Sequence, residues 1–268
     1  MNLSDKEKKA FQEKILSFYK QNGRKLPWRH STNRYHIFVS EVMLQQTQVS
    51  RVIEKYNSWI GEFPTITALS KASLQEVLRM WSGLGYNSRG KRLWEAAKII
   101  EKKYEGIIPT TRKQLEELPG IGPYSARSIL IFADNVELAT VDTNIRRILI
   151  HEFNLPKKTS DDALFQLAQE LLPQGKSREW HNALMDYGAL YLTAKKTGIK
   201  PKTQQSKFKG SRREIRAAII KHLISKEAIT QDTVEELFPH TTHNIEKILE
   251  ELCQEKLITK KGKTYHIS

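Results

Sequence analysis

Cysteine is almost absent from this chain: its 268 residues include one, Cys253. A single thiol excludes a disulfide framework, and it excludes a metal or iron–sulfur site held by several thiolates. No apolar run reaches the roughly 20 residues that a membrane-spanning helix needs, and residues 1–11 lack the apolar core of a secretory signal. These absences predict a cytoplasmic protein without a membrane segment, nucleoid-associated if its source is bacterial or archaeal.

Acidic residues are also fewer than basic ones. The chain has 44 Lys and Arg against 30 Asp and Glu, which gives a formal net charge of +14. Hydrophobic residues make up 39% and charged residues 28%, a composition that is typical of folded, soluble domains. The excess of positive charge indicates a polyanionic partner, of which nucleic acid is the simplest.

Strand-like alternation is scarce before the last stretch, and helical spacing dominates. Val141, Ile145 and Ile148 are one example of apolar residues that repeat on one helical face. This pattern predicts an all-α domain over residues 1–194. Residues 195–210 are rich in lysine and predict an extended basic linker.

Residues 211–268 predict a second, small α+β domain. Two amphipathic helices, the second capped by Thr241 or Thr242, precede a β-hairpin at residues 257–267 with a Lys-Gly-Lys tip. Helices followed by a basic hairpin are typical of winged-helix modules, which bind DNA or other proteins.

One motif, Leu-Pro-Gly-Ile-Gly at residues 118–122, lies between two helical segments. Gly120 and Gly122 allow a tight turn and close approach to a ligand. The following helix, which includes Ser125, directs its first N–H groups toward that turn and provides an anion site. The motif therefore predicts a helix–hairpin–helix that binds a DNA phosphate, with an ordinary turn between helices as the alternative.

Six blocks in a fixed order carry a family resemblance. They are PWR, SEVMLQQTQV, GLGYNSR, LPGIGPYS, VDTN and LMDYGA, at residues 27–29, 40–49, 83–89, 118–125, 141–144 and 184–189. The chain resembles the helix–hairpin–helix DNA glycosylases, and among them it is similar to the adenine glycosylases of the MutY type. The resemblance implies a helical glycosylase domain of two subdomains with the active site between them. It also implies a monomer that binds double-stranded DNA with a mispaired base and removes adenine opposite 8-oxoguanine or guanine.

Removing adenine requires a proton for the leaving base and a carboxylate for the cationic sugar. The resemblance assigns the general acid to Glu41 and the essential carboxylate to Asp142, supported by Asn144. Without the resemblance, Glu41 reads as a surface glutamate and Asp142 as a helix N-cap. Tyr124 stands where lyase-active relatives have a Schiff-base lysine, so we expect a glycosylase without β-lyase activity.

The resemblance also implies DNA contacts. Gln46 matches the residue that enters the base stack, and Leu84 and Tyr86 match residues around the opposite base, although both also suit core packing. Arg29 and Gln45 match positions that line the adenine pocket.

The chain departs from this family in two ways. Most members hold an iron–sulfur cluster with four cysteines just after the last block, where this chain has none, so we expect no such cofactor and no metal. A monovalent cation on the carbonyls of residues 118–122 is the one ion the hairpin suggests. Typical members also end in a β-rich domain that senses 8-oxoguanine, whereas residues 211–268 predict a winged-helix domain. Two alternatives therefore remain: a thymine or uracil glycosylase acting opposite guanine, and a non-catalytic DNA-binding protein.

Overall fold

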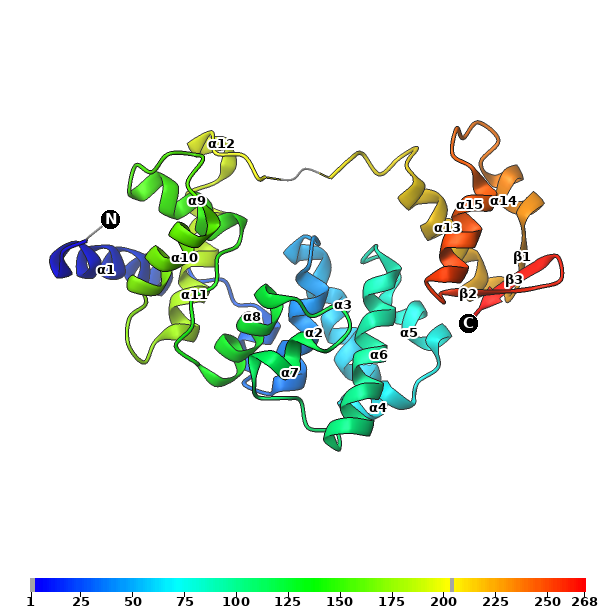
Figure 1. The fold of residues 1–268 in the computed structure, drawn as a ribbon, viewed down its shortest axis with the longest axis horizontal. Helices are drawn as coiled ribbons and strands as arrows, with labels where there is room; N and C mark the ends of the chain where they lie inside the picture. The colour runs from blue at the N-terminus through cyan, green and yellow to red at the C-terminus, as the bar shows by residue number, and fades with distance from the viewer. Residues whose placement is uncertain (1–2, 203–204) are drawn as a thin grey trace. The chain divides into compact units, whose positions relative to one another are not determined.

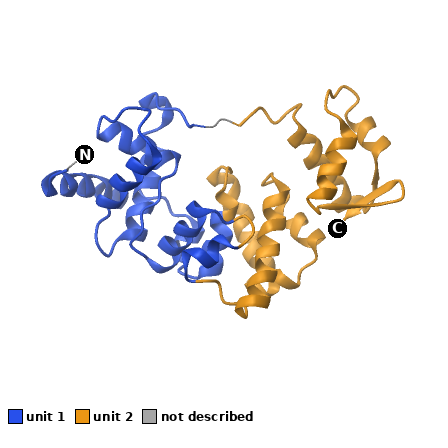
Figure 2. Ribbon diagram, viewed as in Figure 1, with its two compact units in different colours: residues 1–41, 110–117, 121–204 blue, residues 42–109, 118–120, 205–268 orange. Residues whose placement is uncertain are grey.

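The structure, a computed structural model, describes residues 3–202 and 205–268. The chain is mostly helical, with one small sheet near its C-terminal end (Figure 1). It divides into two compact units, residues 1–41, 110–117 and 121–204 and residues 42–109, 118–120 and 205–268 (Figure 2). In the described part of the chain, no helix is both long and apolar enough to span a lipid bilayer. The predicted fold class, a helical domain followed by a small α+β part, is confirmed.

The first unit is built from short helices around one apolar core. Its elements are α1 (Asp5–Asn22), η1 (Pro27–His30), most of α2 (Arg34–Leu44), α7 (Arg112–Glu116), α8 (Pro123–Asp134), α9 (Thr143–Glu152), α10 (Asp161–Glu170), α11 (Ser177–Asp186), η2 (Tyr187–Tyr191) and α12 (Ala194–Thr197). Side-chain caps begin several of them: Ser4 forms a capping box with Glu7 at α1, and Ser160 caps α10. Ile15, Trp180 and Tyr187 are among its fully buried side chains.

The second unit begins inside α2, after Glu41. It continues with α3 (Val49–Glu62), α4 (Ile66–Lys71), α5 (Leu74–Trp81) and α6 (Asn87–Tyr104). Helix α6 packs against α4 and α5. A glycine allows the approach to α5, because a Cβ on Gly90 would lie 2.7 Å from the Trp81 ring.

The C-terminal part of the second unit has the order of a winged helix. Helix α13 (Arg212–Lys226) is followed by β1 (Ile229–Thr230), α14 (Gln231–Leu237), α15 (Ile245–Gln254), β2 (Ile258–Lys261) and β3 (Thr264–Ile267). The antiparallel sheet has the order β1-β3-β2, and Lys261 pairs with Thr264 across the predicted hairpin tip. The predicted cap of α15 was wrong: Asn244, and not Thr241 or Thr242, accepts a hydrogen bond from the Lys247 N–H.

Helix α13 shares a core with α5. Ile215 and Ile219 of α13 belong to the same buried cluster as Leu74 and Leu78 of α5. At the other end of the basic stretch, residues 194–197 form α12 and Ile199 is buried in the core of the first unit. The boundaries at residues 194 and 210 stay predictions.

Candidate active site

Glu41 lies in the last turn of α2, on a helix whose neighbouring side chains are apolar. Phe38, Val42 and Met43 are each at most 3% exposed. Glu41 itself is 9% exposed, which is rare for a glutamate because an ionised carboxylate loses its hydration on burial. The apolar run on both sides of Glu41 therefore places an acid inside the protein.

This environment changes how Glu41 titrates. The pKa of its carboxyl group is raised from 4.5 to about 7, mainly by burial; the Ser128 hydroxyl opposes this rise and the nearby charge of Asp142 adds to it. With a pKa near 7, about half of the Glu41 side chains carry a proton at neutral pH. Glu41 is thus able to act as a proton donor.

Asp142 is the N-cap of α9, as its position before the helical stripe predicts. One carboxylate oxygen, Oδ1, accepts a 2.7 Å hydrogen bond from the Ile145 N–H. The other, Oδ2, accepts a 3.1 Å bond from Asn144 Nδ2. Burial raises the pKa of Asp142, whereas these bonds and the positive charge of Arg147 lower it.

The two carboxyl groups are close enough for the charge of Asp142 to raise the pKa of Glu41. The groups that stabilise the two carboxylate anions differ. Asp142 accepts two N–H hydrogen bonds and is near the positive charge of Arg147, whereas the pKa of Glu41 is lowered by the Ser128 hydroxyl. When like charges share a site, the proton resides on the group whose anion is less stabilised. The arrangement therefore favours a protonated Glu41 beside an ionised Asp142.

Asn144 is itself held in place. Its Oδ1 accepts a 2.5 Å hydrogen bond from Arg147 Nη2, which also donates to the Gly188 carbonyl at 2.8 Å. Arg147 Nε donates to the Leu192 carbonyl at 2.6 Å. Gly188 leaves room for this arrangement, since a Cβ there would lie 2.8 Å from Asn144 Cβ. The amide that bonds Asp142 thus has a fixed orientation.

Tyr124 and Ser128 lie one turn apart on α8. Tyr124 is 37% exposed as a residue, but the desolvation of its hydroxyl, together with the charges of Asp142 and Glu41, raises the pKa of that hydroxyl well above 10, so the phenol stays neutral. Ser128 is 0% exposed, and within residues 3–202 and 205–268 its Oγ makes no hydrogen bond of normal geometry. This hydroxyl nevertheless lies near enough to lower the pKa of both Glu41 and Tyr124.

Two loops of the second unit carry the other predicted DNA contacts. Gln45 donates from Nε2 to the Gly120 carbonyl at 3.2 Å. Gln46 and Tyr86 both adopt left-handed backbone conformations, with φ of 55° and 49°. Tyr86 is 38% exposed, but Leu84 is 3% exposed and packs as a core residue.

Arg89 forms hydrogen bonds with both of these loops. Its guanidinium donates to the carbonyls of Val42, Met43 and Gln45 on one side and to those of Leu84 and Gly85 on the other. Burial lowers its pKa to about 10. One buried cation therefore sets how the loop after α2 and the loop before α6 approach each other.

The glycine hairpin adopts the predicted turn. Gly120 has a φ of 80°, and a Cβ there would lie 3.2 Å from Arg92 Cβ, so glycine suits both the backbone and the space. Gly122 is the N-cap of α8, Pro123 follows at its first position, and Ser125 is buried in its first turn. A cation on the carbonyls of residues 118–122 stays a prediction.

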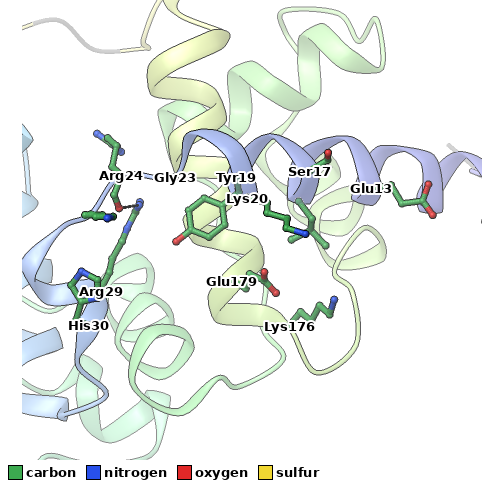
Figure 3. A pocket seen from close by; sticks show the side chains of 12 residues that line it. Glu13, Ser17, Tyr19, Lys20, Gly23, Arg24, Arg29, His30, Lys176 and Glu179 are labelled. Atoms are coloured by element: carbon green, nitrogen blue, oxygen red, sulfur yellow. Dashed lines mark hydrogen bonds between the residues drawn. The ribbon is translucent and has the colours of Figure 1, made fainter.

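Arg29 lies in η1 and forms a two-pronged ion pair with Asp186, at 2.7 and 2.9 Å. Asp186 is fully buried and also binds Arg24 through that residue's Nε and backbone N–H. Arg24 and Arg29 border an open hollow of about 750 Å³, which Tyr19 also lines (Figure 3). Arg29 is therefore bound to a buried carboxylate, and its place in the adenine pocket stays a prediction.

The comparisons with known proteins show the family to which these residues belong. Residues 39–174 match the family model described as "HhH-GPD superfamily base excision DNA repair protein". That range is about half of the chain and includes Glu41, Tyr124, Asp142 and Asn144. The chain belongs to the HhH-GPD superfamily.

Several curated relatives in this superfamily bear the name adenine DNA glycosylase. The protein from Buchnera aphidicola subsp. Baizongia pistaciae is 39% identical over 184 residues, which are 68% of this chain and 52% of that protein. The human protein is 38% identical over 69% of this chain and 36% of its own length. The one from Mycolicibacterium smegmatis is 40% identical over 70% of this chain and 66% of its own length. The chain thus spans about half the length of the first of these relatives.

Solved structures of HhH-GPD proteins share the fold. A thermostable thymine-DNA glycosylase is 29% identical with a TM-score of 0.64, over 73% of this chain and 94% of that one. An endonuclease III from a non-covalent DNA complex has the same TM-score at 16% identity, over 75% of this chain and 91% of its own. The second likeness concerns the fold alone.

The residues of this HhH-GPD chain do not fit the iron–sulfur cluster that the resemblance implies. Such a cluster needs four thiolates, and the chain has one cysteine. Cys253 lies in α15 of the winged-helix part, where burial raises its pKa. In the segment after Asp186, side chains pack against the protein: Tyr187 and Leu192 are buried, and Lys196 Nζ lies 3.4 Å from the centre of the Tyr191 ring.

Four residues of this site were given no role at the active site by the sequence: Ser128, Asp186, Arg89 and Arg147, the last of which was a candidate phosphate contact. Arg89 and Asp186 stand inside blocks that carry the resemblance, which was a usable signal. Ser128 and Arg147 lie one helical turn after Tyr124 and Asn144, so helical spacing toward a predicted site residue was the signal available for them.

Proposed function

We propose that this protein is a monofunctional DNA glycosylase that hydrolyses the N-glycosidic bond of adenine mispaired with 8-oxoguanine or guanine. The observation that carries the proposal is the buried Glu41, whose pKa is raised to about 7 beside the hydrogen-bonded carboxylate of Asp142. The names of the relatives that share this region support adenine as the base.

In the proposed reaction, Glu41 gives its proton to N7 of an adenine that has left the base stack. The bond between C1′ and N9 then breaks, and N9 keeps the electron pair. The ionised Asp142 stabilises the positive charge that develops on the sugar. Water adds its hydroxide to C1′ and its remaining proton returns to Glu41, which leaves an abasic site.

The residue at position 124 supports the absence of strand cleavage. A lyase needs an amine to form a Schiff base with the sugar. Tyr124 carries a phenol and no amine, so it cannot form one; its hydroxyl also stays neutral, with a pKa well above 10. The proposal also includes no iron–sulfur cluster, since one cysteine cannot supply four ligands.

The test is base release in a single turnover, from duplexes that differ at one pair. With A·8-oxoguanine, A·G, T·G and U·G, we expect release of adenine from the first two and no release from the others. Adenine has an N7 that Glu41 can protonate, and thymine and uracil have none. No release from any duplex would contradict the proposal.

A second function is favoured by one observation, the likeness to a solved thymine-DNA glycosylase at 29% identity. It would place thymine or uracil opposite guanine as the substrate. The same four duplexes separate the two functions, because release from T·G or U·G in place of the adenine pairs would establish the second.

Ser128 provides a pH test of the proposed acid. Its hydroxyl lowers the pKa of Glu41, so replacing Ser128 with alanine should raise that pKa. Glu41 then keeps its proton to higher pH, and the alkaline limb of the rate profile should move upward by roughly half a unit to one unit, within the usual spread of such shifts. Single-turnover rates between pH 5.5 and pH 9 measure it, with about tenfold changes across each unit of the limb.

The matched control is Ser40→Ala. Ser40 is the sequence neighbour of Glu41 and is as deeply buried as Ser128, but its Oγ donates to the Ile37 carbonyl of its own helix at 2.9 Å. The Ser40 variant should keep the wild-type profile. A downward shift for Ser128→Ala, or the same shift in both variants, would show that the Ser128 hydroxyl does not act on Glu41.

A further inference from the structure

The loops that carry Gln46 and Tyr86 both belong to the second unit. Glu41 is in the last turn of α2, and the loop that follows begins directly after Leu44. Arg89 binds this loop to the one that ends at Tyr86. The resemblance assigns Gln46 to the base stack and Tyr86 to the surroundings of the opposite base, so we expect that base at the tips of these two loops.

A segment from far along the chain contacts both tips. We call residues 205–213, the last two of which begin α13, the approach segment. Gln205 Nε2 donates to Gln46 Oε1 at 3.1 Å and to the Gln46 carbonyl at 3.3 Å. Arg213 Nη1 donates to the Tyr86 hydroxyl at 3.1 Å.

Arg213 is the centre of a small cation–aromatic group. Its guanidinium lies 5.4 Å from the centre of the Tyr86 ring and 6.0 Å from that of Phe208. Its Nη2 donates to the Ser206 carbonyl at 2.5 Å. Phe208 is 52% exposed, which is uncommon for a phenylalanine. Exposed aromatic rings and arginine guanidinium groups are the side chains on which proteins stack an unpaired base.

The approach segment is held at these loops by packing in its own unit. Helix α13 begins at Arg212, and its Ile215 and Ile219 share a core with Leu74 of α5. Arg212 is occupied elsewhere, since it donates to Glu251 at 2.5 Å. Arg213 is therefore the cation of this pair of arginines that faces the loops.

We propose that Arg213, with Phe208 and Gln205, contacts the base opposite the excised adenine and makes the protein prefer a purine with an O6 carbonyl there. This rests on the proposed function for the identity of the excised base. A guanidinium donates hydrogen bonds and accepts none. It therefore suits the O6 acceptor of guanine and 8-oxoguanine and rejects adenine, which presents an N6 amine at that position.

Binding to an uncleavable product analogue tests the inference without depending on catalysis. The full-length chain is titrated with duplexes that carry a tetrahydrofuran abasic site opposite guanine, 8-oxoguanine or adenine. Wild type should bind the two O6 purines about tenfold more tightly than adenine, the size of one good arginine–base contact. Arg213→Ala should reduce that ratio to near one, and Arg213→Lys and Phe208→Ala should reduce it in part.

The control is Lys221→Ala, which removes one positive charge from the exposed side of the same helix. It should weaken binding to all three duplexes alike and keep the ratio. An unchanged ratio in Arg213→Ala, or an equal loss of affinity for all three duplexes, would overturn the inference, since an equal loss indicates a phosphate contact.

Base release from A·8-oxoguanine separates this inference from the proposed function. If wild type releases no adenine but its binding ratio depends on Arg213, the proposed function fails and the base contact stands. If adenine is released and the ratio does not depend on Arg213, the inference alone fails. Unchanged thermal unfolding of Arg213→Lys shows that a lost ratio is not a lost fold.

Discussion

Replacing Glu41 with glutamine is expected to reduce single-turnover adenine release by about 10²- to 10⁴-fold, the usual contribution of a positioned general acid. Glutamine keeps the shape of the side chain but has no carboxyl proton to give. The pH profile should change as well. Wild-type activity should fall as pH rises through the pKa of Glu41, about 7, because the proton is lost there, and the residual activity of the variant should lack this limb.

The same substitution should make the protein more stable at high pH. A carboxyl whose pKa is raised on folding binds more protons in the folded state, so stability falls as pH rises from its unfolded pKa to its folded one. With a pKa of about 7, the wild-type chain at pH 8 should be less stable than Glu41→Gln by up to roughly 3 kcal/mol. Urea unfolding at pH 5 and pH 8 measures this, and an equal difference at both values would contradict the burial of Glu41 as its cause.

Replacing Asp142 with asparagine is expected to reduce adenine release by about 10³-fold, because a preorganised charge facing the sugar is lost. Asparagine caps helices as well as aspartate does, so the free energy of unfolding should change little. Single-turnover base release measures the rate, and urea unfolding measures the stability. Wild-type release by Asp142→Asn would exclude the carboxylate from the reaction and favour a purely structural cap.

Asp142→Ala is the companion variant. It loses the carboxylate and the hydrogen bond to the Ile145 N–H together. It should be as slow as Asp142→Asn and also less stable by about 1 kcal/mol, the usual value of an N-cap. Two variants with equal rates and unequal stabilities would separate the chemical role of Asp142 from its structural role.

Much of the candidate site was readable from local patterns. The stripe that starts after Asp142 predicted its place as an N-cap, because an N-cap depends on residues within one helical turn, whereas Glu41 was assigned by the resemblance. The hairpin at Gly120 was readable for the same reason: a positive φ and a tight approach require glycine in the local chain.

Long-range pairings were not readable in this way. Arg29, whose place in the adenine pocket stays a prediction, binds Asp186, 157 residues away. Leu84 was a candidate for contact with the opposite base, and the structure places it in the core. In both cases the partner is chosen by which surfaces pack together, and residue type alone does not specify that choice.

By itself, the sequence determined the positive charge, the mostly helical fold and the hairpin, since composition, helical period and turn chemistry act over short stretches of chain; the two carboxyl groups were assigned by the family resemblance. The tertiary structure alone decided how those carboxyl groups share a proton, because that depends on Glu41 of α2, Ser128 of α8 and Asp142 at the N-cap of α9 lying close together. It also decided that Arg213 meets Tyr86, 127 residues earlier in the chain. Burial and distance set the strength of every such interaction, and they exist only once the helices have packed.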